Sequence, residues 1–324
     1  MKPPLIQAFH DFAFQITPTR GELEDIQERA DAIEQAVRDI AGKADKLFES
    51  LSRHLGRSDW GPAPLRYLDT RPFGSSQRGT LIRPIGTIDV DLLLAFEGSP
   101  VVMIYFDDGQ NFLRAIADLL SGLPCKCTLF EGECVRLDYG RPPLLDIFAG
   151  IDWFGNRAQF SFPHGRREIW YRSNPVVFDE WLLRRNRELQ GRLTLMLRML
   201  KSWNRHRRVG LRSFHLETLG AREFQELHGY WPAEILTFLE AGSRKGVKFL
   251  AVSSHDGYTQ DLSADQSAPE NELIIDEFNR SAEVMRRGIA AEKRKNLEAA
   301  VSAFRSVLGN AFPDWQFLAS TYGY

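Results

Sequence analysis

The feature that most constrains this chain is a Gly-Ser pair followed, fifteen residues later, by Asp-x-Asp at the head of an apolar run. The pair is Gly74-Ser75, the carboxylates are Asp89 and Asp91, and the run is 92–96. In a strand, residues i and i+2 share a face, so the two carboxylates lie side by side. At roughly 6–7 Å they repel by about 2–3 kcal/mol at an effective dielectric near 20. The pattern therefore predicts a site for a hard cation such as Mg²⁺.

The residues around the Gly-Ser pair predict a phosphate contact beside that cation. Gly74 allows a backbone to approach a ligand closely. Ser75 can offer a hydroxyl and an N–H to a phosphate if a helical turn begins there.

These residues, together with Gly79-Thr80, resemble the active-site signature of the polymerase-β-like nucleotidyltransferases. Within that superfamily the chain is similar to the cGAS/DncV-like nucleotidyltransferases, or CD-NTases, and more distantly to the oligoadenylate synthases. The resemblance runs as far as the segment of Ser213, while the final third matches only in helical character. It implies an α/β (α+β) architecture: a catalytic lobe with a mixed sheet and a helical C-terminal lobe, bridged by a long N-terminal spine helix.

Composition bounds the class of protein and its partners. The chain has 324 residues, 43% hydrophobic and 26% charged, which suits two lobes with ample core. A net charge of −2 argues against nonspecific coating of nucleic acid. Because no signal-like segment and no 18-residue apolar run is present, we expect a cytoplasmic protein without a membrane partner.

Three cysteines lie close together, at Cys125, Cys127 and Cys134. An odd number in one short stretch suits reduced thiols rather than a disulfide framework. A zinc site would need a fourth ligand such as His164. We favour buried, small apolar side chains.

A long amphipathic helix is predicted near the N-terminus. Thr19 and Glu22 have capping-box spacing. Apolar residues then recur at steps of three and four, at Leu23, Ile26, Ala30, Ile33, Val37, Ile40, Ala44, Leu47 and Leu51. Such a stripe fits either a coiled-coil dimer or a spine helix along both lobes. Because Ala30, Gly42 and Ala44 weaken the seam, we favour the spine and a monomer.

The central segment carries the candidate for a third carboxylate. After a loop at 57–73, we expect a strand or buried segment at 101–106, a helix at 108–120 and a hairpin of 134–139 with 144–149. A lone carboxylate inside an apolar strand is costly unless paired or metal-bound, which singles out Asp146. The resemblance implies that Asp146 completes the metal-binding triad, with Asp138 and Asp152 as competitors. Phe148 stands where the family usually has Pro.

A loop at 163–174 is expected to lead into the helical lobe. We therefore divide the chain into a catalytic domain of 1–174, which includes the spine helix, and a helical nucleotide-binding domain of 175–324. Apolar residues with helical spacing between 189 and 203 predict a helix that carries Lys201, and Ser213 lies in the segment after it. The resemblance implies that Lys201 and Ser213 contact the donor triphosphate. Ala264 to Asn271 departs from the family, so base contacts stay open. A helix from Asn271 to Gly309 and a packed aromatic tail are predicted after it.

The resemblance implies a bacterial CD-NTase that makes cyclic di- or oligonucleotide second messengers from NTPs in CBASS antiphage defence. ATP, with GTP, UTP or CTP as further candidates, would be the substrate, and Mg²⁺ or Mn²⁺ held by Asp89, Asp91 and Asp146 the cofactor. The product would act on a CBASS effector. Alternatives are a template-independent transferase modifying RNA or a protein, and a scaffold with a decayed site.

Residues 176–212 hold ten Lys or Arg against three Asp or Glu. This excess fits either a polyanion site or ordinary solvated helix faces, and we disfavour a nucleic-acid activator.

Overall fold

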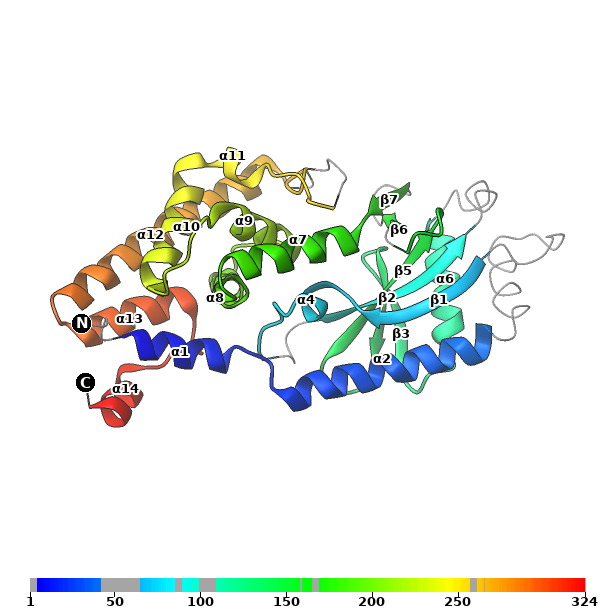
Figure 1. Cartoon of the computed structure of the whole chain (residues 1–324), viewed down its shortest axis with the longest axis horizontal. Helices are drawn as coiled ribbons and strands as arrows, with labels where there is room; N and C mark the ends of the chain where they lie inside the picture. Colours follow the sequence, from blue (N-terminus) through cyan, green and yellow to red (C-terminus); the bar gives the residue numbers. More distant parts are fainter. Residues whose placement is uncertain are drawn as a thin grey trace.

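The computed structural model describes residues 5–41, 65–84, 89–98, 109–157, 159–164, 169–256, 261–264 and 266–323. Figure 1 shows two lobes, one built on a sheet and one on helices. The first has the strands β1 Leu65–Pro72, β2 Asp89–Gly98, β3 Lys126–Phe130, β4 Cys134–Asp138, β5 Leu144–Asp152, β6 Phe160–His164 and β7 Ile169–Ser173, with α2 Arg20–Ala41, α4 Gly74–Gln77 and α6 Gly109–Leu120. The second has α1 Ile6–Gln15, α7 Pro175–Glu188, α8 Arg192–Arg207, α9 Ser213–Glu223, α10 Trp231–Lys245, α11 Val247–Leu250, α12 Ala268–Lys293, α13 Leu297–Leu308 and α14 Trp315–Tyr322.

The described strands form one mixed sheet in the order β1-β2-β5-β4-β3, with β6 and β7 joined through β5. β2 and β5 run parallel, and the other pairs are antiparallel. In this register Asp91 lies beside Asp146, and Asp146 lies beside Arg136. Because paired residues share a face, three charged side chains meet at the centre of the sheet.

The two faces of the sheet bury alternate residues of β2. Val90, Leu92, Leu94 and Phe96 pack under α2 and α6. On the other face, Leu93 and Ala95 pack with Phe160 and Phe162. Asp89 and Asp91 belong to this second face by the period of two.

The apolar stripe of α2 packs on the chain's own sheet. Ile26, Ala30, Ile33 and Val37 are buried there, so these four positions are not free to form a coiled-coil seam, while Leu23 at the start of the stripe is 44% exposed. The Thr19–Glu22 capping box is present. The part of the predicted helix beyond Ala41 lies outside the described residues.

The link between the lobes involves a second helix that the sequence analysis did not predict. α1 packs in the helical core, where Phe9 contacts Phe304 and Phe312 at ring-centroid distances of 5.3 and 4.9 Å. The chain then turns at Thr17–Thr19 into α2, under the sheet (Figure 1). The N-terminal segment therefore spans both lobes as two helices.

Two predicted loops are wrong in their described parts. In the described part of the 57–73 segment, residues 65–72 form β1, which pairs with β2 with a register shift between Tyr67 and Asp69. Residues 57–64 lie outside the described residues. The 163–174 segment contributes to β6 and β7. Pro, Gly and Arg suggested the first of these loops, but β1 is an edge strand, which tolerates these residues because one side of its backbone needs no partner. The 134–139 and 144–149 hairpin is confirmed, whereas the strand or buried segment predicted at 101–106 lies outside the described residues.

The C-terminal helix begins earlier than predicted and is interrupted. Ser267, not Asn271, caps α12 through a capping box with Glu270. Lys295 has φ 63° and Asn296 caps α13, so two helices replace the single one expected. The aromatic tail packs in part: Phe312 is buried and Trp315 packs on the core, while Phe317 is exposed.

Candidate functional site

The three predicted carboxylates lie on adjacent parallel strands. Asp89 and Asp91 come from β2, and Asp146 comes from β5 beside Asp91. Asp146 is only 5% exposed. Its competitors have other partners: the Asp138 carboxylate accepts the Gly140 N–H, and Asp152 accepts those of Phe154 and Arg157. These are turn contacts, and only Asp146 joins the pair on β2.

Arg136 stands between two of the three carboxylates. Its guanidinium donates to both oxygens of Asp146 at 2.7 Å and also to Asp89. It stacks 3.4 Å from the centroid of the Phe130 ring. Hydrogen bonding to Asp146 raises the pKa of Arg136. A permanent cation thus already sits among these acids, and the sequence analysis missed it.

Asp91 carries the least compensated charge of the three. Burial, followed by the neighbouring Asp146, raises the pKa of Asp91 to about 7, although Arg78 and Lys201 oppose the shift. Burial and Asp146 also raise the pKa of Asp89, against the effect of Arg136. Carboxylates that are this crowded favour any arrangement that brings in positive charge.

The carboxylate oxygens of Asp89, Asp91 and Asp146 are suitable ligands for a divalent cation, but the position of Arg136 restricts how all three could bind one ion. Hard cations prefer carboxylate oxygens. In the described residues, no group of three acidic, His or Cys side chains is close enough to enclose an ion as it stands. Because Arg136 occupies the space between Asp89 and Asp146, an ion held by all three carboxylates requires that guanidinium to withdraw.

The Gly-Ser loop is held directly against Asp91. The Phe73 N–H donates to the Asp91 carbonyl at 2.9 Å. Gly74 has φ 62°, and a Cβ there would lie 2.0 Å from Asp91 Oδ2 and 2.9 Å from its Cγ. Only glycine fits such a contact, because any side chain would displace the whole carboxylate. The Ser75 carbonyl accepts the N–H groups of Thr80 and Leu81 at 2.9 and 3.1 Å, which closes the loop.

One cavity of about 410 Å³ brings the predicted residues together between the lobes. The sheet lobe contributes Ser75, Asp89, Asp91 and Asp146, and the helical lobe contributes Lys201, Asn204, Arg205, Ser213 and Phe214. Gly74 lies behind Asp91 and lines an adjoining cavity. The Asn204 side chain bonds both backbone groups of Leu211, which holds the turn before Ser213.

Lys201 reaches this cavity from α8, but not as a free cation. It is 5% exposed, and its ammonium pairs with Glu217 at 2.5 Å and donates to Thr80 at 3.2 Å. Burial lowers the pKa of Lys201, and the Glu217 charge opposes that shift. Glu217 on α9 was missed, because the local sequence 214–219 mixes apolar and polar residues and does not mark it as buried.

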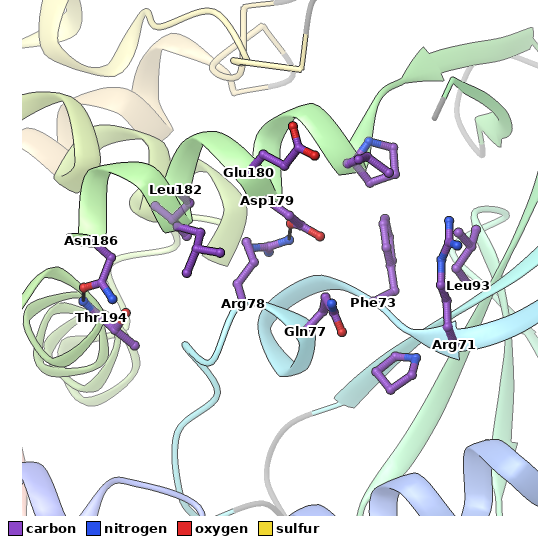
Figure 2. A pocket seen from close by; sticks show the side chains of 14 residues that line it. Arg71, Phe73, Gln77, Arg78, Leu93, Asp179, Glu180, Leu182, Asn186 and Thr194 are labelled. Carbon is purple, nitrogen blue, oxygen red and sulfur yellow. Dashed lines mark hydrogen bonds and ion pairs between the residues drawn. The ribbon is translucent and has the colours of Figure 1, made fainter. Parts of the chain in front are cut away.

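Arg78 lines this cavity and two adjoining ones. Its guanidinium bonds Glu217 at 2.6 Å and Asp179 of α7 at 3.2 Å. One adjoining cavity has a volume of about 360 Å³, and its lining does not include the three aspartates. Figure 2 shows this cavity, with Arg78 pointing at Asp179 and with Arg71, Phe73 and Leu182 around it. The third, of about 260 Å³, carries Tyr171, Arg212 and Phe214.

The cysteines behave as packing residues. Cys134 is buried, and Cys125 and Cys127 are half-buried. Burial raises the pKa of Cys127 to about 12 and also raises that of Cys134, so neither is a reactive thiolate. The side chain of His164, the fourth zinc ligand considered, lies outside the described residues.

No protein-family model matches the sequence, and no curated protein matches it. Solved structures do match in fold. The chain is similar to CdnC of E. coli MS115-1 in its complex with HORMA-deltaN, with 15% identity, a TM-score of 0.72, and 95% of this chain and 98% of that chain covered. It is similar to CdnC with ATP, at 16% identity, a TM-score of 0.70 and the same coverage.

The fold is also that of the Vibrio cholerae cyclic AMP-GMP synthase DncV, solved with the linear intermediate 5′-pppA(3′,5′)pG. Identity is 15% and the TM-score 0.72, with 94% of this chain and 97% of that chain covered. The chain therefore has the mixed α/β nucleotidyltransferase fold of the CD-NTases. In the described residues, no helix is both long and apolar enough to cross a membrane.

Proposed function

We propose that this chain is a bacterial CD-NTase that joins NTPs into cyclic di- or oligonucleotides, with release of pyrophosphate. The observation that carries this proposal is the single cavity in which Asp89, Asp91 and Asp146 face Ser75, Lys201 and Ser213. Transfer of a nucleotidyl group requires acidic groups that can hold a metal ion and phosphate-binding groups in the same cavity.

The proposed roles follow from position. Asp89, Asp91 and Asp146 would hold Mg²⁺ or Mn²⁺, which when bound stabilises charge on the attacking and leaving oxygens. Gly74 keeps the loop against Asp91, and Ser75, Lys201 and Ser213 bind the donor triphosphate. Holding donor and acceptor in one cavity supplies the remaining part of catalysis through orientation.

We propose the division at residue 174, with a catalytic domain of 1–174 and a nucleotide-binding helical domain of 175–324. Separate hydrophobic cores support it, with α1 added to the helical core. We also propose a cytoplasmic, monomeric enzyme. Its substrates would be ATP and further NTPs, and its product would signal to an effector in CBASS antiphage defence.

The test is incubation of the purified protein with radiolabelled NTPs and Mg²⁺ or Mn²⁺, then phosphatase treatment and identification of the products. We expect phosphatase-resistant cyclic nucleotides from NTPs alone. Products that appear only with added RNA or protein would favour a transferase with a macromolecular acceptor.

The matched variant is Asp89→Asn with Asp91→Asn. It should abolish incorporation and leave the fold intact, since removal of like charges relieves repulsion. Circular dichroism and the melting temperature check the fold. Wild-type turnover in this double variant would contradict the proposed site.

A further inference from the structure

We propose that Glu217 is a positioning residue for triphosphate recognition: from the helical lobe, it holds both Lys201 and the Gly-Ser loop of the sheet lobe in their binding positions. This inference rests on the proposed function and deepens it. Its evidence is a buried cluster of Arg78, Thr80, Lys201 and Glu217 at the lobe junction.

Glu217 is 0% exposed and its carboxylate has three donors from two lobes. Arg78 Nε donates at 2.6 Å to Oε2, while the Lys201 ammonium and the Thr80 hydroxyl bond Oε1. A buried carboxylate is tolerated only when it is paired and hydrogen-bonded in this way. Removing its charge leaves two buried cations without their main partner.

The link from Glu217 to the Gly-Ser loop is short and continuous. Glu217 accepts the Thr80 hydroxyl, Thr80 is fully buried, and the Thr80 N–H donates to the Ser75 carbonyl at 2.9 Å. The Ser75 position therefore depends on Thr80, and the Thr80 rotamer depends on Glu217. A residue on α9 thus shapes the loop that binds phosphate in the other lobe.

The same carboxylate maintains the charge of Lys201. Burial lowers the pKa of Lys201, and Glu217 is the first of the groups that counteract it. Burial alone would raise the pKa of Glu217, yet Arg78 and Lys201 hold it at about 2, so Glu217 stays ionised. Loss of that charge would favour a neutral Lys201, because Arg78 is a second cation in contact with the cluster.

A purely structural cross-link makes a different prediction from a positioning residue. If Glu217 only joins the lobes, its loss lowers the stability of the protein and weakens the binding of all nucleotides alike. If it positions Lys201 and Ser75, its loss weakens the binding only of ligands that carry the β- and γ-phosphates. The ratio of affinities for a triphosphate and a monophosphate separates the two.

The experiment titrates the full-length protein with AMP and with α,β-methylene-ATP, which cannot release pyrophosphate, both in the presence of Mg²⁺. The variants are Glu217→Gln, Thr80→Val and Thr80→Ser. The matched control is Glu277→Gln, since Glu277 is a buried carboxylate of the helical lobe that pairs with Arg207 at 2.7 Å and does not line the cavity.

In Glu217→Gln we expect the dissociation constant of α,β-methylene-ATP to rise about tenfold or more, as for loss of one charge-assisted contact, with AMP affinity unchanged. Thr80→Val should lower the affinity for α,β-methylene-ATP relative to AMP in the same way. Thr80→Ser should keep the wild-type ratio of these two affinities because the hydroxyl remains. Glu277→Gln should lower the melting temperature and leave the ratio as in the wild type.

An unchanged ratio in folded Glu217→Gln, or in Thr80→Val if the first variant does not fold, would overturn the inference. Failure of the proposed function would be seen separately, in wild-type protein that incorporates no NTP. Equal loss of AMP and triphosphate affinity would assign Glu217 a structural role only.

Discussion

At the scale of single residues, Arg136 is a cation that occupies carboxylate oxygens of the proposed metal site. It bonds Asp89 and Asp146 at once. A metal ion that used those oxygens would compete with the guanidinium. Burying a lone carboxylate in an apolar strand costs desolvation free energy, and the hydrogen bonds from Arg136 offset part of that cost for Asp146.

Arg136→Gln should therefore bind Mn²⁺ more tightly than the wild type in the absence of nucleotide, since the competing cation is gone. Calorimetric titration with Mn²⁺ measures this. Arg141→Gln is the control, because Arg141 is exposed and pairs with Asp25. Equal or weaker Mn²⁺ binding in Arg136→Gln would show that Arg136 is not a competitor.

The raised pKa of Asp91 gives a prediction for metal-free protein. Between about pH 4 and pH 7 the folded chain keeps a proton on Asp91 that the unfolded chain has lost, so stability from this group falls as pH rises through about 7. Asp91→Asn mimics the protonated form. With EDTA present, its gain in melting temperature over the wild type should be larger at about pH 8 than at about pH 5.

A gain that is the same at both pH values would mean that Asp91 titrates normally. Asp138→Asn is the control, since Asp138 is the exposed last residue of β4 and its carboxylate accepts a local hydrogen bond from the Gly140 N–H.

At the scale of elements, the Gly-Ser loop and β2 form one unit. The loop is fixed to β2 by the Phe73 to Asp91 backbone bond and by the close approach of Gly74. The sequence motif therefore encodes a contact between a glycine and the second aspartate, in addition to a place for phosphate.

Gly74→Ala should abolish NTP incorporation and lower the melting temperature more than Gly79→Ala does. Both glycines have positive φ, so both substitutions cost about 1–2 kcal/mol in backbone energy. Only at Gly74 would the new Cβ also collide with Asp91, since the nearest atom at Gly79 is 3.9 Å away. Equal losses of stability would show that the collision is relieved by a small shift.

At the scale of the whole molecule, the basic excess of residues 176–212 is largely used inside the chain. Arg185 donates to Ala221 and Phe224, Arg192 to Leu227, and Arg205 to Arg83, all through backbone carbonyls. Arg198 bonds Thr17, whereas Arg205 lines the cavity. Arg198 and Arg205 lie within one helical turn of Lys201, and of these two only Arg205 lines the cavity with it.

We therefore expect no stimulation of activity by long DNA or RNA, and a modest salt effect. Nucleic-acid binding through phosphate contacts would fall steeply between about 50 and 200 mM salt, while recognition of one Mg²⁺-chelated triphosphate falls far less. Activity at several salt concentrations, with and without added nucleic acid, measures this. Strong stimulation that is lost at high salt would make the basic segment an activator surface.

The sequence alone determined what short-range periodicity and covalent order control. The period of two placed Asp89 and Asp91 on one face of a strand, the 134–149 hairpin followed from its turn, and the stripe of α2 followed from the helical repeat. The fold class follows from these elements and from the resemblance of the motif.

The tertiary structure decided what depends on residues far apart in the chain. Arg136 is only ten residues from Asp146, on the neighbouring strand of the same hairpin. Glu217, in contrast, lies 137 residues from Thr80, and no local sequence pattern relates Glu217 to Thr80. The strands β1, β6 and β7 were missed because pairing with other strands, rather than local propensity, stabilises them: β1 pairs with β2, β6 with β5, and β7 with β6. Glu217 is buried where partners from both lobes meet, and that meeting is a property of the packed chain.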